Sequence, residues 1–136
     1  MQHSLIDTDI LSELLKKKNS IVVRRAARYL QEYEHFAISA ITQYEVMRGL
    51  KEKSALRQLR KFAEFCESAE ICPINRNVLE RASDLWVLAR RGGHPGRDPD
   101  LIIAATALEH GRVLVTGNTD HFSWIPGLAV DNWRRP

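Results

Sequence analysis

The stretch Ser4-Leu5-Ile6-Asp7-Thr8-Asp9-Ile10-Leu11-Ser12 joins a short apolar run, two acidic residues and the start of a helical pattern. Residues 3–7 have the composition of a buried strand, and residues 9–17 place their large apolar side chains on one side of a helix. Asp7 therefore falls at the carboxyl end of the strand, where the chain turns into the helix. A strand that leads directly into a helix is the repeating unit of an α/β fold.

The same alternation of apolar strands and amphipathic helices continues along the chain. Further strands are predicted at 35–39, 70–74, 112–116 and, at a sheet edge, 128–132, and further helices at 21–34, 42–50, 53–66 and 100–109. Asn75 is the expected cap of one more, long helix, which has Leu79 and Trp86 among its inward residues and ends at Gly92-Gly93. Strands separated by helices indicate an α/β fold with a mainly parallel sheet covered on both faces. A chain of 136 residues is expected to form one domain over its whole length.

Acidic and amide side chains lie next to several short apolar stretches. Asp7 follows 4–6, Glu45 lies six residues beyond 36–39, Asp100 opens the run 101–105, and Asn118 and Asp120 follow 113–116. Residues just past the carboxyl ends of parallel strands converge on one crevice. Carboxylates gathered there repel one another by about 3–4 kcal/mol per pair near 4–5 Å at an effective dielectric of 20. A divalent cation is the usual way to hold them together, so the pattern predicts a metal-dependent site.

Helix capping explains some of the acids and leaves others free. Asp9 or Thr8 is an adequate N-cap for the first helix, which leaves Asp7 without a capping role. Asp98 is a good N-cap for the helix that begins near Pro99. Asp100 then falls in the first turn, where the helix dipole favours a carboxylate without requiring one. Asp7 and Asp100 are therefore the acids assigned to the crevice.

Other residues of the predicted site have competing structural interpretations. Thr42 and Glu45 have the spacing of a capping box, so Glu45 alone would be read as a capping residue, and its company with the other acids favours the site. Asn118 and Asp120 are ordinary residues for a polar turn, predicted here over 116–122. His121 is expected to be a loop or partly buried histidine and not a ligand.

The residue types around the crevice select the metal. The histidines show no paired spacing, and Cys66 and Cys72 are too few and wrongly spaced for a zinc site, so both cysteines are expected to be reduced structural thiols. Oxygen ligands alone suit Mg²⁺ or Mn²⁺. Such an ion polarises a phosphodiester and activates water for in-line attack. No serine, cysteine or histidine is placed to act as a covalent nucleophile.

Charge and targeting signals narrow the partners. The net charge is +3, with basic groups at 16–18, 24–28, 48–61, 90–91 and 134–135, which suit either a polyanion or solvated helix faces. Arg97, next to the third acid, is the first candidate to hold a nucleic-acid backbone. The amino terminus lacks the pattern of a signal peptide and no apolar run is long enough for a transmembrane helix, so a cytoplasmic protein is expected.

Four segments resemble the PIN-domain proteins of the VapC type, the ribonuclease toxins of bacterial toxin–antitoxin pairs. They are Leu5-Ile6-Asp7-Thr8-Asp9-Ile10-Leu11-Ser12, Ser39-Ala40-Ile41-Thr42-Gln43-Tyr44-Glu45-Val46-Met47-Arg48-Gly49, Gly96-Arg97-Asp98-Pro99-Asp100-Leu101-Ile102-Ile103-Ala104-Ala105, and Thr116-Gly117-Asn118-Thr119-Asp120-His121-Phe122 with Ile125-Pro126-Gly127-Leu128 and Trp133. Each motif alone is weak, whereas four in order with family-like spacing are specific. The resemblance runs nearly from end to end.

The resemblance implies an α/β/α sandwich, Mg²⁺-dependent RNA cleavage, a homodimer and inhibition by a small cognate VapB-type antitoxin. It also implies that Asp7, Glu45 and Asp100 are the family's three main acids. The fourth position, which is aspartate in many members, is matched by Asn118. Either Asn118 contributes through a water molecule or Asp120 substitutes for it.

Three other classes explain the residues less well. A haloacid-dehalogenase-type phosphatase also opens with two spaced aspartates, but it leaves Glu45 unexplained and needs room for a cap domain. A response-regulator receiver needs a lysine after a late strand, and residues 116–118 offer none. A catalytically silent PIN-like module that binds RNA or a protein would be expected to have lost one of the three main acids. Cleavage of RNA with and without Mg²⁺ separates all of these.

Overall fold

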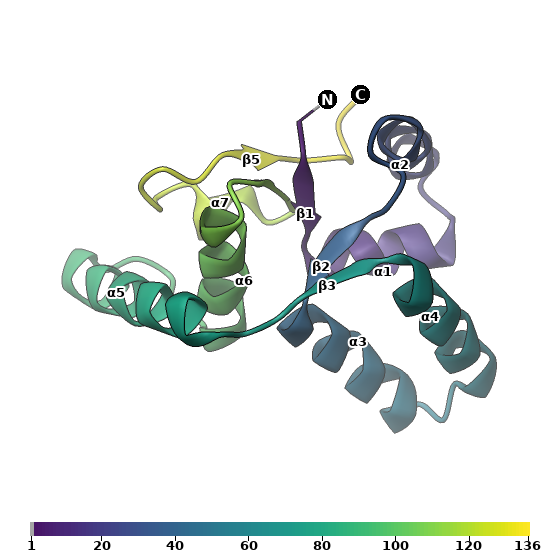
Figure 1. Ribbon diagram of the computed structural model, residues 1–136, viewed down its shortest axis with the longest axis horizontal. Helices are drawn as coiled ribbons and strands as arrows, with labels where there is room; N and C mark the ends of the chain where they lie inside the picture. Colours follow the sequence, from purple (N-terminus) through teal and green to yellow (C-terminus); the bar gives the residue numbers. More distant parts are fainter. Residues whose placement is uncertain (1) are drawn as a thin grey trace.

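The computed structural model describes residues 2–136, in which five short strands alternate with seven helices (Figure 1). The elements are β1 (Ser4–Ile6), α1 (Thr8–Lys16), α2 (Ser20–Tyr33), β2 (Ala37–Ser39), α3 (Ala40–Glu52), α4 (Leu56–Ser68), β3 (Glu70–Cys72), α5 (Arg76–Gly92), α6 (Asp98–Glu109), β4 (Val113–Val115), α7 (Thr119–Phe122) and β5 (Val130–Asp131). Every predicted strand and helix is present, with ends that differ by up to three residues for the helices. Only α7 was missed, because four residues are too few for a helical period to show within the predicted turn.

All the strand pairs are parallel. β1 pairs with β4 and β4 with β5, while β2 pairs with β3. β1 also lies beside β2, so the strands follow one another in space as β3, β2, β1, β4 and β5. β5 forms an edge, as predicted. Within β1–β4–β5 and within β2–β3, the carboxyl ends therefore point the same way.

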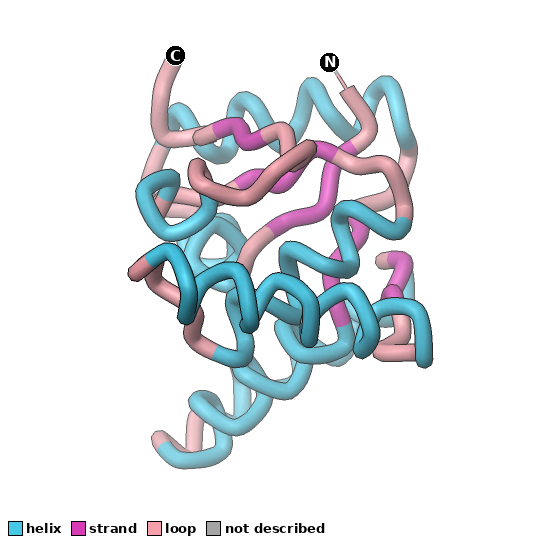
Figure 2. Tube along the Cα trace, turned by 90° about the vertical axis from the view of Figure 1, so that its left-hand side faces the viewer, coloured by secondary structure: helices cyan, strands magenta, loops and turns pink. Residues whose placement is uncertain are grey.

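Alternating side chains of the strands bury two apolar cores. Leu5 and Leu114, which are opposite each other in the β1–β4 ladder, pack with α5 and α6. Their neighbours Ile6 and Val115 point to the other face and pack with α1 and α2. Helices therefore cover the strands on both sides (Figures 1 and 2). This arrangement confirms the predicted α/β/α sandwich.

The α6 helix is the central helix of the first core. Its apolar side chains are buried on almost every side, with Ile103, Ala104, Ala105 and Ala107 fully enclosed. A short helix that is apolar all round belongs inside a globular protein. Within residues 2–136, no helix is both long and apolar enough to cross a bilayer.

The α5 helix lies at the outside of the fold, and it corrects one expectation. Asn75 caps it as predicted, since its Oδ1 accepts from the Val78 amide at 3.0 Å. Leu79 and Trp86, however, do not face the core: they are 50% and 43% exposed. Only the narrow stripe that includes Val78 and Leu85 meets α6, so the residues one position further along the helix point outward.

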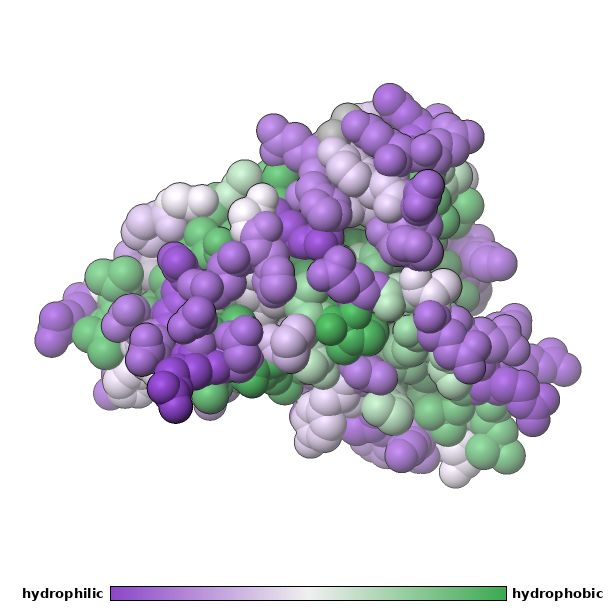
Figure 3. All heavy atoms as spheres, in the orientation of Figure 1, coloured by the Kyte–Doolittle hydropathy of each residue, from purple (hydrophilic) through white to green (hydrophobic). Residues whose placement is uncertain are grey.

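Leu79 and Trp86 join Leu101 and Ile102 of α6 around a surface hollow of about 360 Å³. Figure 3 shows apolar residues emerging among the charges over α5, at the left of the molecule.

Candidate active site

Asp7 lies at the point where β1 passes into α1 and is 5% exposed. Its Oδ1 accepts from the Thr8 amide at 2.8 Å, and its Oδ2 accepts from the Thr116 hydroxyl at 2.7 Å. Helix α1 begins at Thr8, so Asp7 is itself the N-cap. The prediction that Asp9 or Thr8 caps the helix and leaves Asp7 without a capping role was wrong, because the helix starts one residue earlier than expected.

Burial raises the pKa of Asp7 from 3.8 to about 7, and the neighbouring carboxylates of Asp9 and Asp100 push it in the same direction. The hydrogen bonds from Thr116 and Thr8 act in the opposite sense but are outweighed. Within residues 2–136, no basic side chain forms an ion pair with Asp7. Asp7 is thus a buried acid whose negative charge is uncompensated.

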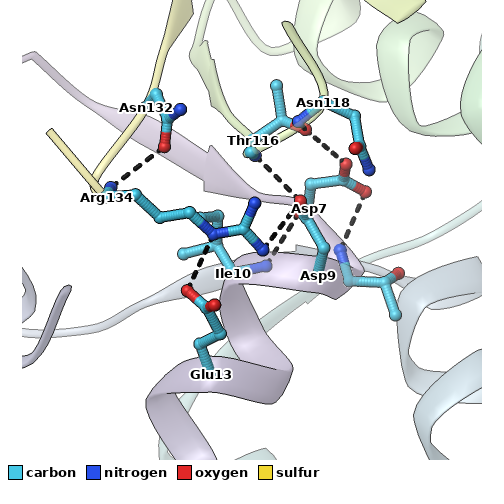
Figure 4. Close-up of polar contacts among 10 residues, drawn as sticks. Asp7, Asp9, Ile10, Glu13, Thr116, Asn118, Asn132 and Arg134 are labelled. Carbon is cyan, nitrogen blue, oxygen red and sulfur yellow. Dashed lines mark hydrogen bonds and ion pairs between the residues drawn. The ribbon is translucent and has the colours of Figure 1, made fainter. Parts of the chain in front are cut away.

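Asp9 supports the site from within the first turn of α1 (Figure 4). Its Oδ2 accepts from the Gly117 amide at 2.9 Å and lies 3.6 Å from Nη2 of Arg134. Arg134 also donates to Oε2 of Glu13 at 2.9 Å. Asp9 therefore ties α1 to the turn after β4 and has a cationic partner that Asp7 lacks.

Glu45 reaches the site from α3. Its Oε1 accepts from the Thr8 hydroxyl at 2.9 Å, and its Oε2 is 3.8 Å from Nη2 of Arg48. Helix α3 begins at Ala40 with Ser39 as its cap, so the capping-box interpretation of Thr42 and Glu45 is wrong. Thr8 thus connects two acids, through its amide to Asp7 and through its hydroxyl to Glu45.

Asp100 lies in the first turn of α6, with a side chain that is 19% exposed. Its Oδ2 is 3.3 Å from Nδ1 of His121, which belongs to α7. The structure corrects the assignment of Asp98 as the N-cap: α6 begins at Asp98 itself, Arg97 occupies the cap position, and no side chain caps the helix. Asp98 lines the hollow beside α5 instead.

The segment after β4 contributes differently from what the sequence indicated. Asn118 and Asp120 are both exposed. The backbone amide of Asn118 donates to the Thr116 hydroxyl at 3.0 Å, which in turn donates to Asp7. His121 is the side chain of this segment that lies against an acid. Sequence reasoning gave it no role, because a four-residue helix offers no periodic signal that would aim it at Asp100.

Residues 4–127 match the family model described as the PIN domain. The chain belongs to the PIN-domain family. It is 32% identical to Ribonuclease VapC1 of Methanocaldococcus jannaschii over 93% of this chain and 83% of that protein, which places it among the VapC-type members. It is also 26% identical to the tRNA(fMet)-specific endonuclease VapC of Shigella flexneri, over 95% of this chain and 96% of that protein.

Solved structures of toxin–antitoxin complexes share the fold of this PIN domain. DNA-bound VapBC from Salmonella typhimurium superposes with a TM-score of 0.85 at 25% identity, covering 98% of this chain and 99% of that chain. A toxin–antitoxin complex from Klebsiella pneumoniae has a TM-score of 0.69 at 33% identity, covering 93% of this chain and 95% of that chain. Both matches extend over nearly the whole chain.

The acids of this PIN domain have the chemistry that suits a hard cation. Asp7 caps α1, Glu45 lies on α3 and Asp100 on α6, and all three offer only oxygen atoms. Their ligand atoms do not all lie within 4.8 Å of one another, so a cation would have to draw the carboxylates together. Asp7 and Asp100 have no lysine or arginine partner in the described part of the chain, and the Arg48 side chain beside Glu45 is 54% exposed. A divalent cation would supply the positive charge that the protein does not provide. The residues therefore fit the group that the family resemblance implies.

Proposed function

We propose that this PIN domain is the toxin of a type II toxin–antitoxin pair, an endoribonuclease that hydrolyses RNA phosphodiesters with the help of Mg²⁺, for which Mn²⁺ can substitute. The observation that carries the proposal is Asp7: a buried carboxylate, beside two other acids, without a cationic partner. A fold selected for stability alone gains nothing from this arrangement. A nuclease gains carboxylates that can hold a cation.

Asp7 and Asp100 would hold the ion, with Glu45 completing the acidic site. A divalent cation held there would polarise the phosphodiester and lower the pKa of the attacking water molecule. The protein's own contribution is position. Thr8 and Thr116 hold the Asp7 carboxylate from both sides, and Thr8 fixes Glu45 relative to it. Hydrogen bonds of this kind keep ligands at a fixed geometry before substrate arrives.

The fourth position is assigned to Asn118, acting through a water molecule, in preference to Asp120. The support is the short chain of hydrogen bonds from the Asn118 backbone through Thr116 to Asp7. Asp120 is exposed and lies two residues further along. Alanine substitution of each residue in turn separates the two possibilities. Loss of the residue that contacts the ion should raise the Mg²⁺ concentration needed for half-maximal cleavage, and loss of the other should not.

RNA is held by exposed basic residues around the acids. Arg97 immediately precedes α6, and the Arg48 side chain projects beside Glu45. Contacts with phosphates provide affinity that falls steeply with salt and carries little sequence information. Binding of RNA by an inactive Asp7→Asn protein should therefore weaken as the salt concentration rises, and further when Arg97 is replaced by alanine.

Control by a cognate VapB-type antitoxin follows from the same geometry. An arginine of the partner could pair bidentately with the uncompensated carboxylates, while an apolar helix lies in a groove of the α2–α4 region. Tyr44 of α3 and Leu56 of α4 are 53% and 72% exposed there. The hollow between α5 and α6 is the candidate surface for a homodimer. We also propose that the protein acts in the cytoplasm, where it would meet RNA.

The decisive test is cleavage of RNA by the purified protein with Mg²⁺ and with a chelator. We expect cleavage only with the ion, and none by Asp7→Asn. Asp84→Asn, a change of the same kind on the exposed side of α5, is the matched control and should retain full activity. RNA binding without cleavage by the wild-type protein would contradict the proposal and favour a catalytically silent RNA-binding module.

A further inference from the structure

A second group of metal-ligating side chains lies at the opposite end of the strands from the acids. Glu70 and Cys72 belong to β3, and His110 directly follows α6. One ligand atom from each of the three lies within 4.8 Å of the others. Glu70 and Cys72 are two residues apart in a strand, so their side chains extend from the same face. This cluster is the one set of three such ligands found within residues 2–136.

From this juxtaposition we infer that Glu70, Cys72 and His110 form a binding site for a transition-metal dication of the Zn²⁺ class. A thiolate, an imidazole and a carboxylate are the donors that Zn²⁺ takes in proteins. The site lies away from the acidic residues and does not depend on the proposed ribonuclease activity. Neither the cysteine nor the histidine spacing predicted it, because the packing of β3 against the end of α6 brings the ligands together.

The distances are close to those that the ion requires. Ligand bonds of about 2.0–2.3 Å in a tetrahedron place neighbouring donor atoms roughly 3.3–3.8 Å apart. Side-chain movements of about 1 Å would bring the observed group into that range. Cys72 is buried, whereas Glu70 and His110 are exposed, so the ion would reach the site from solvent and keep a water molecule as its fourth ligand.

Arg112 prepares the carboxylate for this role. Its Nη2 donates to Oε1 of Glu70 at 2.7 Å, and its Nη1 donates to the Ser4 carbonyl at 3.2 Å. Oε2 of Glu70, the oxygen that Arg112 leaves free, accepts a weak hydrogen bond from the Cys72 thiol at 3.6 Å. The cation would take the place of the thiol proton between these two atoms. Arg112 would remain as the partner that orients the carboxylate.

Binding releases one proton, from the Cys72 thiol, to solvent. The thiolate and the carboxylate then carry two negative charges against the dication and the Arg112 guanidinium, so the occupied site has a net charge of +1. The buried Cys72 must lose its thiol proton to bind, so the site favours a cation with a strong preference for thiolate. Mg²⁺ has no such preference. The two ends of the molecule would therefore select different ions.

Binding would link the edge strand β3, through Glu70 and Cys72, to the connection between α6 and β4. A metal that binds the folded chain and not the unfolded one stabilises the fold in proportion to its concentration. We therefore expect Zn²⁺ to raise the melting temperature by several degrees while Mg²⁺, acting at the acidic end, does so independently.

Titration of the full chain with Co²⁺ tests the inference, because a cobalt–thiolate bond gives a charge-transfer absorption that oxygen ligands do not. We expect this band to appear with one equivalent of Co²⁺, to disappear when Zn²⁺ is added, and to persist in excess Mg²⁺. Cys66→Ser is the matched control, since Cys66 lies on α4 away from the cluster, and should keep the band. Cys72→Ser should lose it.

Two further variants protect the test against a folding defect at the buried Cys72. His110→Gln changes an exposed ligand and should weaken Co²⁺ binding at least tenfold without lowering the metal-free melting temperature. Asp7→Asn should leave the cobalt band unchanged, whether or not the protein cleaves RNA. Absence of the band in the wild-type protein, an unchanged affinity in His110→Gln, or loss of the band in Cys66→Ser would each overturn the assignment.

Discussion

The two ends of the strands treat charge in opposite ways. At the amino ends, the buried Arg112 has a side chain that is 6% exposed, and Glu70 neutralises it with an ion pair of 2.7 Å. At the carboxyl ends, Asp7 is buried to a similar degree and has two acids nearby instead of a cation. Buried charges are ordinarily paired. The end that breaks this rule is the end to which we assign the chemistry.

The stability lost by burying the unpaired Asp7 carboxylate can be calculated to an order of magnitude. Raising the pKa of Asp7 from 3.8 to about 7 corresponds to roughly 4 kcal/mol of lost stability when the group is ionised. A whole domain of this kind is stable by about 5–15 kcal/mol. Asp9 and Glu45 differ from Asp7 in having an arginine nearby, Arg134 and the partly exposed Arg48 respectively.

The largest expected effect comes from removing the negative charge at the carboxyl ends. Asp7→Asn and Asp100→Asn should each lower RNA cleavage by about 10³-fold or more, which is about 4 kcal/mol of transition-state stabilisation. Asn is as good an N-cap as Asp, so the start of α1 should survive the change at position 7. Single-turnover cleavage and thermal melting, measured together, check both halves of the expectation. A variant that unfolds at a much lower temperature would show that the acids stabilise the fold. The contrast between paired charges at the amino ends and unpaired acids at the carboxyl ends would then be wrong.

The second prediction concerns the pH dependence of stability without metal. The folded state raises the pKa of Asp7, so it binds a proton between about pH 4 and 7 that the unfolded chain has released. The contribution of Asp7 therefore favours folding by up to roughly 4 kcal/mol below about pH 4, and it declines as the pH rises until it is lost above about pH 7. Urea denaturation at pH 5 and pH 8 with a chelator should detect about 3 kcal/mol of this loss.

The difference between the wild-type protein and Asp7→Asn isolates this contribution from other titrating groups. The variant should lose less stability between pH 5 and pH 8 than the wild type. Added Mg²⁺ should restore stability to the wild type at pH 8 and do little for the variant. Equal pH dependence in both proteins would mean that Asp7 is compensated after all.

The third prediction concerns the stability provided by the Arg112–Glu70 ion pair at the amino ends of the strands, which Arg112→Met removes. The change removes the ion pair with Glu70 and the hydrogen bond to the Ser4 carbonyl, for an expected loss of about 2–3 kcal/mol. Glu70 is half exposed, so it can be solvated after Arg112 is lost, and the full penalty for an orphaned buried charge does not apply. Denaturant unfolding measures the loss. RNA cleavage below the melting temperature should stay within about twofold.

The sequence predicted the parts of this picture that depend on local pattern. The order of strands and helices followed from apolar periodicity. The joint role of Asp7, Glu45 and Asp100 stays a prediction: Asp7 does follow a strand, whereas Glu45 and Asp100 lie on α3 and α6. The capping assignments of Asp9 and Asp98 failed because each depends on the single residue at which a helix begins. A shift of one residue at the start of α1 made Asp7 the cap.

The remaining differences come from packing between distant segments. Leu79 and Trp86 have helical spacing that suits a core, but α5 lies at the outside of the fold and leaves them exposed. The contact between His121 and Asp100, and the cluster of Glu70, Cys72 and His110, join segments with no shared local pattern. Only the folded arrangement could reveal them.

The fourth prediction tests how the carboxyl end tolerates its charge. Arg134→Gln removes the cation that lies 3.6 Å from Asp9 and leaves the negative potential on Asp7 stronger. The Arg134 side chain is 35% exposed, so we expect only about 1 kcal/mol of lost stability. Cleavage should fall less than tenfold, and Arg134→Lys should recover part of it. Gly117→Ala is a second way to disturb the same contact, since a Cβ there would lie 2.6 Å from Oδ2 of Asp9.

The smallest effect is expected for Asp98, an acidic residue close to Asp100 in the sequence that we place outside the active site. Asp98→Ala should change stability by no more than about 0.5 kcal/mol, because α6 has no side-chain cap and Asp98 contributes only through the helix dipole. Asn75→Ala is the matched control on α5: its side chain accepts a hydrogen bond from the Val78 amide, so its loss should cost about 1 kcal/mol. Paired denaturation curves compare the two variants. Asp100→Asn is expected to abolish cleavage at unchanged stability. If Asp98→Ala does the same, Asp98 belongs to the active site together with Asp7 and Asp100.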